Sequence, residues 1–177
     1  MKTRRWCALA AFLTLGLVGC AGVPVERYRA EQPVLDRARY FNGTIDGWGM
    51  FQDRSGEVIK HFTVVIEATW QGNVGTLDEH FTWADGTTSR RVWTITADGE
   101  GRYRGRADDV IGEASGEAAG NALHWRYVLA LPVGEKVYHV DFDDWMFLID
   151  ERVMLNRSAM KKWGFHLGEV TLSFTRR

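Results

Sequence analysis

The chain has 177 residues, a formal net charge of −1 at pH 7 and two cysteines, and 45% of its residues are hydrophobic. Its basic residues form no dense run or face, which excludes the usual electrostatic footprint of a nucleic-acid-binding protein. At this length, one folded domain of ordinary size is expected.

Residues 1–19 predict a bacterial lipoprotein signal peptide. A basic start is followed by an apolar run, Trp6–Val18, which is too short for a comfortable membrane span. The run ends in Leu17–Cys20, which matches the lipobox, the motif whose cysteine receives diacylglycerol before cleavage. Cys20 is therefore the predicted lipidation site and the first residue of the mature chain. An ordinary secretory signal followed by a chance cysteine is the alternative.

The residue after the cysteine is Ala21 rather than aspartate, which favours the outer membrane. We therefore expect a lipid-anchored protein of the cell envelope that faces the periplasm. The leader carries three of the 22 basic residues and none of the 23 acidic ones, which leaves a mature net charge of about −4. Because Cys7 departs with the leader and Cys20 is acylated, no thiol remains for a disulfide, a metal or a nucleophile.

The segment 20–39 is predicted to be the lipidated N-terminus and a polar tether. It contains Pro24 and Pro33 and has no sustained apolar period, although a helical turn near Val34–Arg39 is expected. The folded domain is then residues 40–177, and no fixed-period repeat is visible in it.

The folded domain alternates apolar and polar residues with a period of two. The pattern is clearest in residues 62–70, 123–131 and 170–174, and short turn sequences separate such runs. This spacing joins antiparallel strands by hairpins and leaves no room for crossover helices. We predict an all-β fold, an antiparallel up-and-down β-barrel of about eight to ten strands, because closure removes exposed edges.

One hairpin can be analysed in more detail. A two-residue turn at Asp85-Gly86 would place Trp83 on the face of Val92, whereas a three-residue loop, 85–87, places it on the face of Trp93. The second register buries both tryptophans together and is preferred, since register follows the apolar pattern. It also brings Glu79 and Arg91 to the inner face, near enough to pair. That pair is either a satisfied ion pair in the wall or a contact for the polar group of a ligand.

Aromatic side chains are abundant and spread over most of the predicted strands. Most will be core, because aromatics bury large areas. A barrel of eight or more strands can also enclose a small apolar ligand, so a hollow and a filled barrel are both open. The predicted lining residues of a hollow barrel are Trp48, Trp83, Trp93, Trp125 and Tyr127, with Glu79 and Arg91 as polar contacts.

Several sequence words resemble one family, the DUF3833 family of bacterial lipoproteins. They are Tyr40–Gly43, Gly47–Gly56, Gly75–Glu79, Gly120–Leu123, Phe142–Met146, Asn156-Arg157 and Gly168–Leu172. The resemblance covers essentially all of the mature domain. It implies a lipocalin-like barrel of unknown function, encoded beside genes for membrane fatty-acid modification. Lipid-related work is thereby implied by association only, since fold alone does not confer function.

The densest polar cluster offers weak candidates for catalysis. Asp143 and Asp144 precede a tryptophan, and Arg157 lies downstream. Neighbouring carboxylates can perform acid–base chemistry when their environments separate their pKa values, but they can equally pair with an arginine and hold the barrel together. The histidines lack the spacing of a metal site, and His124 is expected to face solvent. We expect no metal and no cofactor.

Two classes of function remain, and the first is preferred. It is a membrane-anchored periplasmic lipoprotein that binds or carries a fatty acyl or other lipid ligand, in connection with membrane lipid modification. The second is a small envelope enzyme that acts on a modified lipid. A structural or interaction protein with a filled barrel is a third option. No nucleophile motif or cofactor loop is visible, which favours binding over catalysis.

Overall fold

The computed structural model describes residues 22–177, so the predicted signal peptide and the predicted lipidation site Cys20 lie outside the described residues. A 3-10 turn, η1 (Val25–Tyr28), and one turn of α-helix, α1 (Arg37–Tyr40), precede the strands. The strands are β1 (Gly43–Asp53), β2 (Val58–Gln71), β3 (Val74–Trp83), β4 (Thr88–Ala97), β5 (Arg102–Arg106), β6 (Ala114–Ala119), β7 (Ala122–Val133), β8 (Lys136–Leu148), β9 (Val153–Lys162) and β10 (Phe165–Arg176). Neither described helix is long and apolar enough to cross a membrane.

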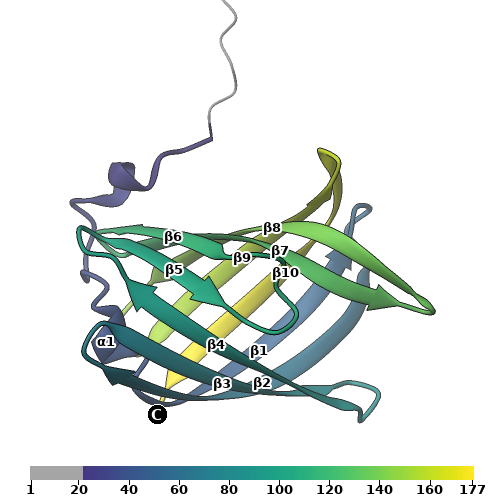
Figure 1. Cartoon of the computed structure of the whole chain (residues 1–177), viewed down its shortest axis with the longest axis horizontal. Helices are drawn as coiled ribbons and strands as arrows, with labels where there is room; N and C mark the ends of the chain where they lie inside the picture. The colour runs from purple at the N-terminus through teal and green to yellow at the C-terminus, as the bar shows by residue number, and fades with distance from the viewer. Residues whose placement is uncertain (1–21) are drawn as a thin grey trace, which may run out of the picture.

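The strands form one closed antiparallel barrel, in which each strand pairs with its neighbours in the chain (Figure 1). β10 returns to pair with β1, from Ile45 opposite Arg176 to Asp53 opposite Gly168. Closure satisfies the backbone hydrogen-bonding groups that a free sheet edge would expose. The predicted all-β fold and the up-and-down barrel of eight to ten strands are confirmed, with ten strands.

The two ends of the barrel differ (Figure 1). The hairpins β1–β2, β3–β4, β7–β8 and β9–β10 turn at one end, here named the open end, whereas α1 lies at the other, the closed end. Tyr40 of α1 is 3% exposed, and its hydroxyl donates to the carbonyl of Arg152 at 3.1 Å. Phe41 follows it into the core. The helical turn expected in this region therefore caps the closed end.

The barrel wall is incomplete where β5 and β6 stop short. The segment that connects them runs along β7 and fills the gap: the Ile111 N–H donates to the Val128 carbonyl, and the Ala130 N–H donates to the Asp109 carbonyl, both at 2.8 Å. The carboxylate of the same Asp109 holds Arg91 on β4, with Oδ2 2.7 Å from Nη2. Asp109 thus joins β7 to β4 and closes the wall.

The segment predicted to be a tether packs against the barrel in its described part, with Val25 in the outer cluster and Leu35 in the interior one. Val25 in η1 and Leu35 are only 2% and 4% exposed. The Leu35 N–H donates to the carbonyl of Gly120 in the β6–β7 turn at 2.8 Å, and Tyr28 meets Phe147 edge-on at 5.0 Å. The tether interpretation is wrong for these residues, because isolated apolar side chains in a polar stretch find burial on the barrel wall.

The β3–β4 hairpin has the predicted inner face, although its loop begins one residue earlier than expected, at Ala84. The Gly86 N–H donates to the Trp83 carbonyl at 2.9 Å, and Gly86 has a φ of +81°. This is the three-residue hairpin loop with a glycine in the left-handed region. The pairing shifts by an even number of residues, so the same side chains stay inside and Glu79 lies directly opposite Arg91.

Buried apolar residues form two clusters on opposite sides of the wall. The larger cluster lines the interior, and the smaller one, around Val25, Ala119 and Ala122, lies outside under η1. All ten strands and both clusters fall within residues 22–177. Because the barrel closes on itself in this range, we expect residues 22–177 to fold as a unit.

Candidate functional site

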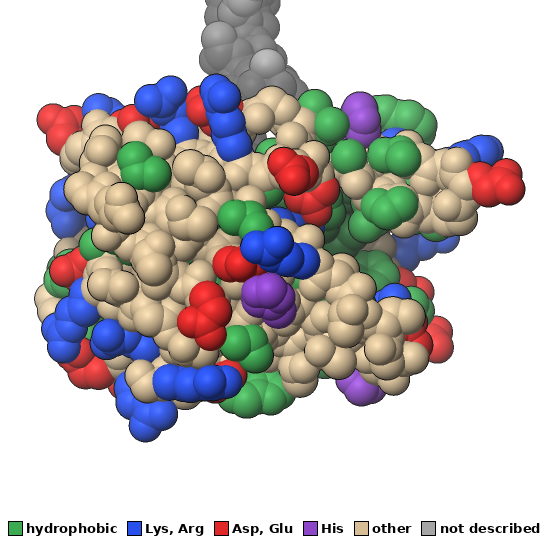
Figure 2. Space-filling model, turned by 60° about the horizontal axis from the view of Figure 1, so that its bottom comes forward, with side chains coloured by type: hydrophobic (Ala, Val, Ile, Leu, Met, Phe, Trp, Pro, Cys, Tyr) green, Lys and Arg blue, Asp and Glu red, His purple; other side chains and the backbone are tan. Residues whose placement is uncertain are grey.

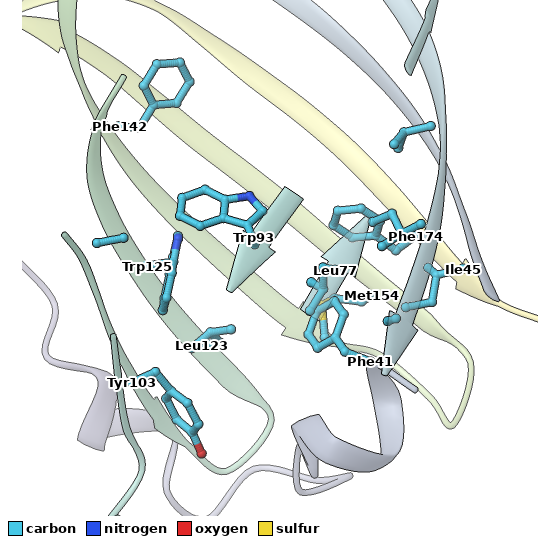
Figure 3. Packing of buried hydrophobic residues seen from close by; sticks show 14 of the residues in the cluster. Phe41, Ile45, Leu77, Trp93, Tyr103, Leu123, Trp125, Phe142, Met154 and Phe174 are labelled. Atoms are coloured by element: carbon cyan, nitrogen blue, oxygen red, sulfur yellow. The ribbon is translucent and has the colours of Figure 1, made fainter. Parts of the chain in front are cut away.

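The barrel interior is hollow and encloses a cavity of about 730 Å³. Its wall is mostly aromatic and aliphatic, and it reaches from α1 at the closed end to Trp83 and Pro132 near the open end. Figure 3 shows Trp93 and Trp125 on one side of the interior, with Phe174 and Ile45 across from them. Pockets that bind small molecules commonly span about 300–1,000 Å³ and are largely apolar, as this cavity is.

The cavity exists because aromatic rings lie back against the wall. A Cβ added to Gly105 on β5 would be 2.5 Å from the Trp125 ring, and one added to Gly116 on β6 would collide with the same ring. The missing side chains of the two glycines therefore leave room for the indole ring against the barrel wall. Trp93 meets that indole edge-on at 5.6 Å and meets Tyr127 edge-on at 5.3 Å. Bulky side chains thus cover the wall without filling the centre.

A charged cluster interrupts the apolar wall halfway along the barrel. Arg91 hydrogen-bonds both carboxylate oxygens of Asp109, at 2.7–3.0 Å, and its Nη1 lies 3.8 Å from Glu79 Oε2. The expectation that Glu79 and Arg91 share the inner face and pair is confirmed. Burial is the largest single influence on the pKa of Arg91 and lowers it, but the hydrogen bonds to Asp109 and the negative charges around it together raise that pKa more, so the guanidinium stays charged.

Two carboxyls in this cluster have pKa values raised to near neutral pH. Burial raises the pKa of Glu79 to about 7, although the nearby Arg91 opposes the rise. Burial likewise raises the pKa of Asp144, on β8, to about 7. Tyr127 on β7 is buried beside them, and its pKa lies well above the ordinary value for the same reason. Desolvation disfavours the charged form of each acid, which is the physical cause in all three cases.

The cluster contains buried acceptors without partners among the described residues. One carboxylate oxygen each of Glu79 (Oε2) and Asp144 (Oδ1), and the hydroxyl oxygen of Ser158, have no hydrogen-bond partner. All three residues line the cavity. A buried polar atom without a partner is costly, and it marks a place where a ligand or water completes the structure.

Most of the predicted ligand-binding residues meet in this cavity. Those that line it are Glu79, Trp83, Arg91, Trp93, Trp125 and Tyr127. The structure brings them together from β3, β4 and β7, but contact with a ligand stays a prediction.

The exception is Trp48, which lies on the outer face and is 53% exposed. Its expected place in the lining is wrong. Ile45 is fully buried and sets the alternation of β1, so Gly47 and Gly49 are the inward positions on either side of Trp48. The ring of Phe62 lies across Gly49 and fills the space that a side chain would take. Because a glycine carries no apolar signal, the sequence pattern assigns the wrong face to this strand.

The three weak catalytic candidates are separated by the barrel wall. Asp144 lines the cavity, whereas Asp143 lies outside and its Oδ1 meets Nε2 of His124. Arg157 is also outside, where its Nε donates to Glu169 at 3.0 Å. An acid–base site made of these three residues is therefore wrong. Consecutive residues of a strand point to opposite faces, so two adjacent aspartates cannot both reach the interior.

His124 is not exposed to solvent, which corrects a further expectation. It is 9% exposed, and its ring stacks on Trp145 with centroids 4.0 Å apart. Trp145 in turn meets Tyr28 of η1 edge-on at 5.8 Å. The N-terminal segment therefore covers this part of the outer face, which the barrel strands alone would leave exposed to solvent.

The sequence did not predict several polar residues of the cavity, among them Asp109, Ser158 and Arg37. Asp109 sits in the β5–β6 connection, where no periodicity marks a direction. Ser158 alternates with the buried Met160 on β9 and could have been found from that pattern. Arg37 of α1 lines the closed end, lies 3.9 Å over the Tyr103 ring and leaves its Nε without a partner. Burial lowers the pKa of Arg37 to about 10.

Apolar side chains are unusually exposed around the open end. Trp163 and Phe165 in the β9–β10 hairpin are 84% and 73% exposed, and Val137 and Ile59 on neighbouring hairpins exceed 50%. Figure 2 shows hydrophobic side chains beside a recess at the right of the molecule. These exposed apolar side chains, here named the apolar rim, offer an apolar ligand a surface to approach, although charged residues such as Lys60 and Lys162 lie among them.

Residues 22–177 contain no group of three histidine, cysteine or acidic side chains placed to hold a metal ion. The candidate site consists of the cavity and the charged cluster in its wall.

The chain was compared with protein families and with curated proteins. A family model described as "Protein of unknown function (DUF3833)" matches residues 14–176. A search of curated proteins finds no match to the chain.

Proposed function

The chain belongs to the DUF3833 family, and because that description states no activity, we propose from the cavity itself that the protein binds an acyl-chain-bearing ligand inside its barrel. The ligand enters past the apolar rim of the open end and lies along the aromatic wall. The proposal rests chiefly on one observation, the hollow interior of about 730 Å³. A barrel built only for stability would fill that space with its own side chains, since protein interiors are close-packed.

The energetics of an apolar chain in this cavity give a quantitative expectation. Each methylene moved from water to apolar surroundings contributes about 0.8 kcal/mol, which is about fourfold in affinity. Affinity for a series of alkyl chains should therefore rise steeply with length and level off when the chain fills the cavity. A surface patch would give a shallower rise and no plateau.

We propose that this binding takes place at the cell envelope, on the outer membrane, with Cys20 acylated and the barrel facing the periplasm. The sequence Leu17–Cys20 supports the anchor, and Ala21 supports the outer membrane. Metabolic labelling with an alkyne palmitate analogue tests the anchor: label should enter the wild-type chain and be lost in Cys20→Ser. Fractionation of the same cells tests the membrane.

The experiment for the binding function is native mass spectrometry of residues 22–177, purified from the host without detergent, followed by lipid extraction. We expect a co-purified acyl species in near-stoichiometric amount. Trp93→Ala should change the amount or the chain-length profile of that lipid. Trp48→Ala is the matched control, because it removes the same side chain from the outer face of the barrel.

Two results would overturn the proposal. One is a folded protein that carries no lipid and binds no member of a fatty-acid, alcohol and amine panel. The other is an identical lipid profile for the wild type, Trp93→Ala and Trp48→Ala, which would place any bound lipid outside the cavity.

A further inference from the structure

The charge balance of the cavity restricts the polar group of its ligand. The one arginine of the central cluster, Arg91, is already held at 2.7–3.0 Å by Asp109. That ion pair also closes the wall between β4 and the β5–β6 connection, so Arg91 is committed to the fold. Glu79 and Asp144 are left as carboxyls whose negative charge no second cation of the cluster balances.

The groups that face these two carboxyls come from every neighbouring element. Arg91 and Asp109 act on Glu79 from β4 and from the β5–β6 connection, and Asp144 acts on it from β8. Burial raises the pKa of Asp144, whereas the nearby hydroxyl donors of Ser158 on β9 and Tyr127 on β7 and the charge of Arg91 lower it. The neighbouring Asp143 on the outer face raises that pKa. The cluster as a whole is rich in acceptors, and three of its buried oxygens have no hydrogen-bond partner among the described residues, although Oε2 of Glu79 lies 3.8 Å from Nη1 of Arg91.

We propose that the ligand carries a hydrogen-bond donor, such as a hydroxyl, amide or amine, that binds to Glu79, Asp144 and Ser158, and that a free carboxylate is disfavoured there. This inference rests on the proposed function and specifies the chemical class of its ligand. A ligand hydroxyl supplies one hydrogen-bond donor and an ammonium group supplies three, so either can satisfy at least one of the three oxygens that lack a hydrogen-bond partner. A carboxylate would instead bring another negative charge next to two acids, which is unfavourable in a poorly hydrated site.

The position of the cluster adds a geometric consequence. Glu79, Asp144 and Ser158 lie near the middles of their strands, so apolar wall continues on both sides of them, toward Trp83 at the open end and toward Tyr103 at the closed end. The ligand therefore has apolar groups on both sides of its donor, or ends in the donor with its chain in one half of the cavity.

The test compares three ligands with the same dodecyl-length chain, namely dodecylamine, dodecanol and dodecanoate, titrated into residues 22–177 at about pH 8. We expect the amine and the alcohol to bind at least about tenfold more tightly than the carboxylate, as one satisfied hydrogen bond to a charged group provides. The ratio of the amine's affinity to the alcohol's affinity measures how much a positive charge contributes beyond hydrogen-bond donation. Its affinity should fall as the pH is lowered through about 7, where both carboxyls become protonated.

Variants assign the preference to the cluster. Glu79→Gln and Asp144→Asn, measured separately, should each reduce the amine's advantage over dodecanoate severalfold. Asp143→Asn is the matched control, because it makes the same change one residue away on the outer face. Thermal unfolding of each variant confirms that a folded protein is compared.

The outcomes separate this inference from the function beneath it. Failure of all three ligands to bind would overturn the proposed function together with the inference. Equal or tighter binding of dodecanoate would overturn the inference alone. If that dodecanoate binding were lost in Arg37→Gln, the polar group would be an anion at the closed end, where Arg37 has an unpartnered nitrogen.

Discussion

Aromatic side chains are packed differently on the inner and outer faces of the barrel wall. Outside, His124 and Trp145 stack and are covered by η1, so this aromatic patch is filled by the chain's own residues. Inside, Trp93 and Trp125 cover the wall and leave a cavity open between them and the opposite strands. Close packing is thus available to this chain, and its absence from the interior reflects the space that the inward glycines give to the rings.

The two faces also set the chemistry of adjacent residues. Asp143 and Asp144 have the same side chain and follow each other on β8. Asp143 meets a histidine outside, whereas burial raises the pKa of Asp144 to about 7 inside. The difference teaches that the side of the wall, rather than the residue type, determines the role of an acid here.

The largest expected difference between the faces is the loss of a tryptophan. Trp93→Ala should lower the free energy of unfolding by about 3–5 kcal/mol, the usual cost of deleting a buried aromatic. Trp48→Ala, on the outer face, should cost about 1 kcal/mol or less, because Trp48 is 53% exposed. Urea unfolding of both variants measures this difference. Equal decreases in the free energy of unfolding would contradict the distinction between the two faces.

The next effect is a dependence of stability on pH. Because the folded state raises the pKa of Asp144 above its ordinary value, it binds a proton that the unfolded chain has already released between about pH 4 and 7. The free energy of unfolding should therefore fall as the pH rises through that window. Asp144→Asn should be more stable than the wild type by about 4 kcal/mol at pH 8 and should have a flatter profile.

Asp143→Asn is the control for that profile. It leaves Asp144 and its burial in place and removes only the smaller contribution of the Asp143 charge to the raised pKa, so it should keep most of the wild-type slope. Chemical denaturation at a series of pH values gives both curves. A wild-type stability that rises from pH 5 to pH 8 would show that the inner carboxyls are paired rather than merely buried.

A smaller effect tests why the cavity is hollow. Gly116→Ala should push the Trp125 ring away from the wall and cost about 2 kcal/mol through overpacking. The affinity for a dodecyl ligand should fall as well, because the ring moves into the space the chain occupies. Ser115→Ala, on the exposed face of the same strand, should change neither quantity. An unchanged affinity in Gly116→Ala would show that the position of the Trp125 ring does not affect ligand binding.

The smallest effect concerns the outer ion pairs. Arg157 and Glu169 pair on the surface, where the arginine side chain is 71% exposed. Arg157→Ala should therefore alter the free energy of unfolding by less than about 0.5 kcal/mol and leave ligand binding unchanged. A strong loss of ligand binding in this variant would contradict the division between the two faces.

Much of this site could be predicted from individual strands. The alternation in β3 and β4 places Glu79, Arg91 and Trp93 on one inner face, even though the loop position is off by one residue. Trp48 was misplaced because its inward neighbours are glycines, which carry no apolar signal. Asp109 could not be found at all, since it lies in a connection whose path depends on β7.

By itself, the sequence determined the fold class, the closed meander of short-linked strands and the partners within a hairpin, because these depend on period-two patterning and on turns a few residues long. Only the tertiary structure decided that the barrel is hollow, that Asp144 rather than Asp143 faces the cavity, and that the N-terminal segment covers the wall. Each of those outcomes depends on residues from strands far apart in the chain, such as Gly105 and Gly116 beneath Trp125. Contacts of that kind form only when the barrel closes, and no local pattern contains them.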